Sequence, residues 1–156
     1  MLGHNLRKEA GQALVELALV VPVFTVLLIG AAEFGRLAYA DIEVCNAARA
    51  GAAYASQNHV TADTTDATNL ANINKAVTQD APNVGGITAT VTDTCSCSDG
   101  TSGVTCSNAG TTCISPGRIL ETVQVYTTAI VNVGIHLKGN TGSFTLHGLA
   151  NMRVME

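Results

Sequence analysis

A long uncharged apolar run near the start of this chain constrains its fold more than any other feature. Leu17 to Ala32 carry no charge, and extended back to Gln12 the run approaches the roughly 20 residues that cross a bilayer as a helix. Arg7 and Lys8 precede the run. By the positive-inside tendency we expect the first residues to stay in the cytoplasm and the rest of the chain to be exported.

An acidic residue, Glu16, stands at the edge of this run. A charged side chain at the centre of a spanning helix costs about 2.5–3.5 kcal/mol, so an intramembrane carboxylate usually has a partner. Cleavage after Gly11 would give Gln12 a free amine, largely protonated at neutral pH because its reference pKa is about 8. Glu16 would then lie one helical turn from that amine or face the amine of a neighbouring subunit. The alternative is a tolerated polar residue that reaches the membrane interface.

The rival interpretation of the run is an ordinary secretory signal peptide. Gly30-Ala31-Ala32 offers small residues at a possible cut, which would start the mature chain at Glu33. Two features favour a retained helix instead. Glu16 interrupts the join between the basic and apolar parts, and helix-compatible residues continue past Ala32 without a break.

Helix-compatible sequence extends from Gln12 to about Ala55, with a kink expected at Pro22. These residues would span about 66 Å, roughly twice the hydrocarbon thickness, so we expect half of the helix to leave the membrane. Glu33 and Arg36 are spaced as a solvated helical pair. The apolar face expected in the second half comprises Phe34, Leu37, Ile42, Cys45, Ala48 and Ala52.

The remainder of the chain predicts a small exported domain. After a polar loop over 56–65, Thr65-Asp66 opens a second helix that Pro82 ends. Alternating apolar residues then predict strands over 87–92, 120–131 and 144–154, with a turn at 139–142. We expect an α+β fold in which a long N-terminal helix packs on a small antiparallel sheet. The predicted divisions are a leader over 1–11, the helix over 12–55 and the domain over 56–156.

Four cysteines fall in a polar segment, 93–118, which we expect to be an insertion at a hairpin tip. In an exported domain, four cysteines predict two disulfides with three possible connectivities. The alternative is a tetrahedral zinc site, but the C-x-C and C-x6-C spacings lack the usual knuckles, and an oxidising compartment disfavours thiolates. A fifth cysteine, Cys45, is expected to pack as an apolar side chain. The disulfide candidates are Cys95, Cys97, Cys106 and Cys113.

No catalytic or cofactor pattern stands out. His59, His136 and His147 are isolated, and the chain has no metalloprotease, serine-hydrolase or phosphate-loop motif. We therefore expect no enzyme, no cofactor and no metal. Eight basic against 12 acidic residues give a net charge of −4, which excludes the basic stripe that nucleic-acid binding needs.

The segment GQALVELALVVPVFTVLLIGAAEFGRLAYADIEVCNAARAGAAYA resembles the N-terminal region of TadE-like proteins, which are pseudopilin-type proteins of the tight-adherence pilus system. The resemblance covers about residues 10–55. It implies a bacterial inner-membrane protein, cleaved by a prepilin peptidase, that assembles with other pilin-like subunits as a homo- or hetero-oligomer. By position, Gly11 precedes the cut, Gln12 becomes the new terminus and Glu16 is the charge-pairing carboxylate.

The expected function is therefore assembly or structure of a pilus-type filament. Two alternatives remain open at this point. The chain could be a filament-forming major subunit, although the roughly 100 residues beyond the helix favour a minor or priming role. It could also be an exported adhesive module that uses 93–118 as its contact loop and the helix as an anchor.

Overall fold

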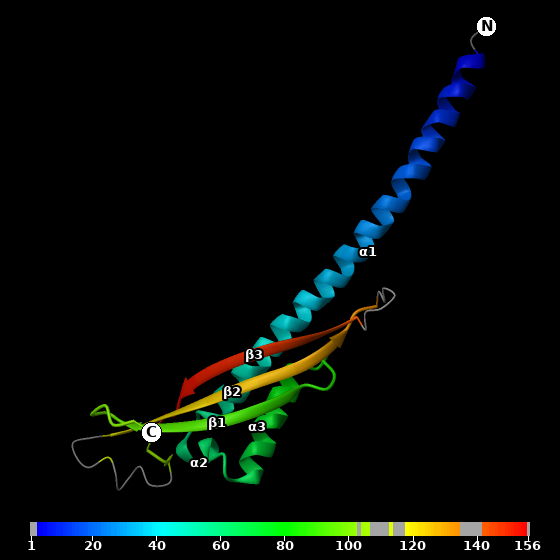
Figure 1. The fold of residues 1–156 in the computed structure, drawn as a ribbon. Helices are drawn as coiled ribbons and strands as arrows, with labels where there is room; N and C mark the ends of the chain where they lie inside the picture. Colours follow the sequence, from blue (N-terminus) through cyan, green and yellow to red (C-terminus); the bar gives the residue numbers. More distant parts are fainter. Residues whose placement is uncertain (1–2, 103, 107–112, 114–117, 135–141, 156) are drawn as a thin grey trace. The chain divides into compact units, whose positions relative to one another are not determined.

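The computed structural model describes residues 3–102, 104–106, 113, 118–134 and 142–155 (Figure 1). The chain divides into two compact units, Met1–Leu37 and Ala38–Glu156, and the boundary falls inside the first helix. The elements are α1 (Gly3–Ala55), α2 (His59–Ala62), α3 (Ala67–Asp80), β1 (Thr88–Cys97), β2 (Ile119–Asn132) and β3 (Ser143–Arg153).

Helix α1 confirms the long apolar helix. It is 53 residues long, is unbroken across Pro22, and begins at Gly3 rather than at the predicted Gln12. Large apolar side chains between Leu14 and Ile29 are 45–71% exposed with respect to the described residues. Within the described residues, Gly11–Ala55 contains one stretch long and apolar enough to cross a membrane, with a mean hydropathy of 2.5.

The second unit contains a three-stranded antiparallel sheet in the order β1-β2-β3, as Figure 1 shows. The predicted alternation is confirmed on β2, where Val123, Val125 and Ala129 are buried on one parity together with Thr127. The residues of the opposite parity are more exposed. The register pairs Cys95 with Glu121 and Val125 with Ala150. Together with the long helix this is the predicted α+β, pilin-like arrangement.

A close backbone approach joins α1 to the inner face of the sheet. Buried Thr127 on β2 donates its hydroxyl hydrogen to the Val44 carbonyl of α1, at 2.9 Å. A methyl group built on Gly148 of β3 would lie 2.5 Å from that same carbonyl oxygen. Gly51 lies further along α1, at a junction with Val77 of α3. Small residues at these positions let the helix backbone lie directly on the strands.

The face that α1 presents to this core differs from the predicted one. Ile42 is 57% exposed and Phe34 is 74% exposed, whereas Val44 is fully buried. Glu43, a carboxylate outside the predicted apolar face, is also buried, and its Oε1 accepts a hydrogen bond from Asn83 at 2.7 Å. The predicted face is confirmed at Ala48 and Ala52, which are fully buried. It was wrong at Phe34 and Ile42, because small residues rather than the larger apolar ones meet the sheet. The buried α1 residues are Ala40, Glu43, Val44, Ala47, Ala48, Gly51, Ala52 and Ala55.

The connection after α1 is partly helical, which corrects the predicted loop over 56–65. Asn58 and Thr61 form a capping box that starts the short helix α2. Helix α3 confirms the second predicted helix, and Asp66 caps it by accepting from the Thr68 backbone N–H at 2.7 Å. The buried face of α3 carries Ile73 and Val77.

The predicted insertion is shorter than expected, because β1 continues to Cys97 and β2 begins at Ile119. Thr, Ser and Cys side chains of this β1 extension alternate between exposed and buried positions, as in the preceding strand. The buried cysteines of this extension, Cys95 and Cys97, continue the inner face of β1 into the segment that was predicted to be an insertion. His136 and most of the predicted turn at 139–142 lie outside the described residues.

Candidate functional site

The residues singled out for processing and assembly lie together on the apolar part of α1. Gly11, Gln12 and Glu16 are exposed, and no side chain lies within 4 Å of a methyl group built on Gly11. The side-chain amide of Gln12 donates to the Glu16 carboxylate at 3.3 Å, across one helical turn. This spacing is the one that would bring an amine at residue 12 close to Glu16.

Two disulfides close the segment beyond the β1–β2 ladder. Cys95 is joined to Cys106 and Cys97 to Cys113, with separations of 11 and 16 residues. The structure thus takes one of the three connectivities that the sequence left open. The two bridges interleave along the chain, and Cys95 and Cys97 occupy inward positions on β1. Cys45 is free and half-buried, with its Sγ 3.8 Å from the His147 carbonyl oxygen.

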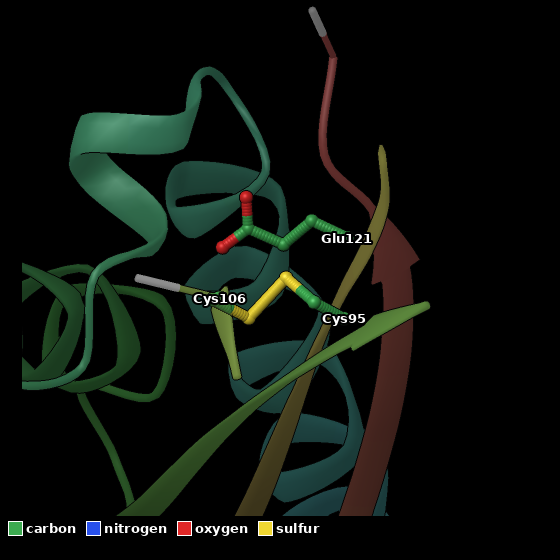
Figure 2. Close-up of side chains that lie close together, drawn as sticks. All are labelled: Cys95, Cys106 and Glu121. Atoms are coloured by element: carbon green, nitrogen blue, oxygen red, sulfur yellow. A yellow bond between two sulfur atoms is a disulfide. The ribbon is translucent and has the colours of Figure 1, made fainter. Parts of the chain in front are cut away.

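Glu121 approaches the first bridge from the neighbouring strand. Figure 2 shows its carboxylate beside the sulfurs of Cys95 and Cys106, and candidate ligand atoms of these three residues lie within 4.8 Å of one another. Zinc binds thiolates, and sulfurs joined in a disulfide are not thiolates. The oxidised structure therefore does not supply the ligands of the zinc site considered as the alternative.

His59 is not isolated, contrary to the sequence prediction. Its Nδ1 lies 2.5 Å from Glu121 Oε2, across 62 residues of chain. The hydrogen bond to Glu121 is the main cause that raises the pKa of His59, and the charges of Asp63 and Asp93 raise it further. Glu121 shares its parity with Val123 on β2, so a buried carboxylate could have been read from the strand pattern.

We expect this pair to make the stability of the second unit depend on pH. Because the folded pKa of His59 is raised, its contribution is complete below the unfolded pKa of about 6.5 and is lost as pH rises through the folded value. The His59 side chain is 63% exposed, which limits the contribution to about 0.2–1 kcal/mol. Urea unfolding of wild type and His59→Gln should differ at pH 5.5 and converge in mildly alkaline buffer. A difference in the free energy of unfolding that did not change with pH would contradict a raised pKa of His59.

Two smaller predictions about polar side chains can be compared with the structure. Arg36 lies 3.4 Å from Glu33, which confirms the i, i+3 pair. His147 is exposed on β3 and, contrary to the prediction, is not isolated. Its Nδ1 lies 2.6 Å from the Tyr126 hydroxyl, and the two rings stack with centroids 5.4 Å apart.

Comparisons with known proteins identify the N-terminal part of the chain. Residues 11–53 match the family model described as TadE-like protein. The matched range covers the candidate span, the exposed Glu16 and the part of α1 that packs on the sheet. No curated protein and no solved structure matches the chain. The match confirms the family resemblance found in the sequence.

Proposed function

We propose that this chain, whose residues 11–53 match the TadE-like family model, is a membrane-anchored, pseudopilin-like subunit that takes part in assembling a tight-adherence pilus. The family implies a role with the pilus machinery, and it is not a family of enzymes. The observation that carries the proposal is the coincidence of the family match with the exposed apolar stretch of α1, which holds Glu16 at its N-terminal edge.

In this proposal α1 waits in the inner membrane, with its N-terminus in the cytoplasm and the disulfide-bonded unit exported. Oxidised Cys95–Cys106 and Cys97–Cys113 support the exported location, because disulfides persist in oxidising compartments. A prepilin peptidase cuts between Gly11 and Gln12. The assembly machinery then extracts subunits from the membrane. Their apolar helices, which contacted lipid, now pack against the helices of neighbouring subunits.

Glu16 fixes the axial position of one subunit against the next in this scheme. Its carboxylate pairs with the amine of Gln12 in the same or a neighbouring subunit. The attraction within a buried ion pair is largely offset by the cost of its desolvation. The pair therefore sets the axial alignment of neighbouring subunits and adds little to the free energy of their association. In the uncleaved chain, the Gln12 side chain occupies the position at Glu16 that the amine would take.

Intact-mass analysis of the protein from its native membrane tests the processing step. We expect a mature chain that begins at Gln12. Gly11→Ala should retain the leader, whereas Gly35→Ala, at another open helix position, should be processed normally. A mature chain that begins at Glu33 would instead establish a cleaved signal sequence and overturn the proposal.

Glu16→Ala tests the assembly step. We expect pilus number to fall by about tenfold or more, equivalent to about 1.4 kcal/mol in subunit register, while the membrane level of the protein stays unchanged. Glu33→Gln is the matched control, because this carboxylate at the other end of the run already pairs with Arg36. Normal pilus number in Glu16→Ala cells would remove the register hypothesis.

A second candidate function is an adhesive module at the disulfide-closed tip. The observation that favours it is that both bridges start from the last residues of β1 and tie the following segment to the end of the β1–β2 ladder. Since β1 extends to Cys97, a deletion should span 98–118 rather than 93–118, with the two unpaired cysteines changed to serine. Loss of surface binding with normal pilus number would favour adhesion, and loss of pili would favour assembly.

A further inference from the structure

A cleft of about 560 Å³ opens inside the second unit, between α2 and the adjoining ends of β1 and β2. Its wall combines the Cys95–Cys106 bridge with Val104 on one side and polar residues on the other. Figure 2 shows the Glu121 carboxylate projecting from β2 toward the bridge in this region. The cleft is separate from the Gly11–Glu16 segment assigned to processing and assembly.

The charge of the cleft is strongly one-sided. Asp63, Asp93 and Glu121 line it, and His59 is the one basic side chain among its described lining residues. Thr65 donates from both its backbone N–H and its hydroxyl to Asp63, and these hydrogen bonds lower the pKa of that carboxyl. The Thr64 hydroxyl donates to Asp93. At neutral pH the cleft therefore carries a net negative charge.

Glu121, which lines this cleft, has a carboxylate oxygen without a hydrogen-bond partner among the described residues. Its side chain is 6% exposed, and Oε2 is taken by His59. Its Oε1 is buried and has no hydrogen-bond partner among the described residues. An unpaired buried acceptor costs about 1–3 kcal/mol, more when it is charged. A donor that entered the cleft and reached Oε1 would remove this cost.

The spacing of the acidic groups favours an organic cation over a metal ion. Among the described residues, the ligand-atom cluster within 4.8 Å joins Glu121 to the two bridged sulfurs and includes neither Asp63 nor Asp93. Ca²⁺ needs six to eight oxygen ligands at 2.3–2.6 Å. A long cationic side chain has different needs, because its aliphatic stem packs on apolar surface while its charged head contacts carboxylates.

We propose that this cleft binds a lysine or arginine side chain presented by a partner protein. The aliphatic stem lies against Val104 and the Cys95–Cys106 bridge. The head group donates to Glu121 Oε1 and is attracted by Asp63 and Asp93. This contact would be a docking point in the exported unit, independent of the helix-mediated assembly proposed above.

Titration of the full oxidised chain in detergent micelles with the peptides acetyl-Gly-Arg-Gly-amide and acetyl-Gly-Lys-Gly-amide tests the proposal. The neutral counterpart contains citrulline, which keeps the shape of arginine without its charge. We expect the His59 ring resonances to shift, with an affinity for at least one cationic peptide about tenfold above that for the citrulline peptide. Equal affinity for the cationic and neutral peptides would overturn the proposal.

Glu121→Gln should abolish this tenfold preference, because the amide keeps the size of the side chain and removes its charge. Asp63→Asn, at an exposed wall position where the amide oxygen can still accept from Thr65, should weaken binding severalfold and serves if Glu121→Gln does not fold. Asp80→Asn, at an exposed carboxylate outside the cleft, is the matched control and should bind as wild type. Unchanged binding in Glu121→Gln, or saturable Ca²⁺ binding at the same resonances without any peptide preference, would refute the proposal.

Discussion

Gly148→Ala should destabilise the second unit by about 3 kcal/mol or more, the largest effect we expect from a single methyl group in this chain. The added carbon would lie 2.5 Å from both the Val44 carbonyl oxygen and the Thr127 hydroxyl. Neither neighbour can retreat easily, because one is helix backbone and the two are joined by a buried hydrogen bond. Thermal unfolding of the sheet, followed by circular dichroism, should shift downward by about 10 °C or more.

Alanine substitutions at two other glycines serve as comparisons for this result. Gly85→Ala meets nothing within 4 Å and should leave the unfolding temperature nearly unchanged. Gly51→Ala meets the Val77 side chain at 2.6 Å, so we expect an intermediate loss that side-chain movement partly relieves. If Gly148→Ala were as stable as Gly85→Ala, α1 would not lie as close to β3 as the structure places it.

The same contact shows what the sequence could and could not predict about the fold. Period-two alternation on β2 predicted which residues face inward, and Asp66 with Pro82 marked α3, because these signals are local. The contact of Gly148 with Val44 depends on chain segments about 100 residues apart. No local pattern marks a glycine as the place where a helix backbone meets a strand.

The misassigned face of α1 has the same origin. Phe34 and Ile42 were assigned to the buried face because they are large, but a close helix–sheet approach selects small residues such as Ala47, which was not assigned to it. Alanine carries little hydrophobic signal, so the buried stripe was hard to see. The apolar character of α1 before Leu37 needed no tertiary information and was predicted correctly.

The candidate sites divide in a similar way. Gly11, Gln12 and Glu16 are close in sequence, so their spacing on one helix was predictable. The pairing of four cysteines and the contact of His59 with Glu121 join separate elements. Neither could be predicted without the register of β1 with β2, which places Cys95 opposite Glu121.

Removing the two disulfides should lower stability by more than the sum of the single losses. A chain-entropy estimate for isolated loops of 11 and 16 residues gives about 2.8 and about 3.1 kcal/mol. The bridges interleave, however, so either one already shortens the loop that the other closes in the unfolded chain. Each single loss should therefore fall below its isolated value, while the double loss includes one full closure.

The variants are Cys95→Ser with Cys106→Ser, Cys97→Ser with Cys113→Ser, and all four changes together. Urea unfolding of the full chain in detergent, followed by the sheet signal in circular dichroism, gives the three free energies of unfolding. Cys45→Ser is the matched control, because this thiol is free and its loss opens no loop. The opposite result is that the two losses in the free energy of unfolding, one for each removed bridge, add up to the loss measured with all four changes. That result would mean that the bridges constrain independent parts of the unfolded chain, contrary to the interleaved order of Cys95, Cys97, Cys106 and Cys113.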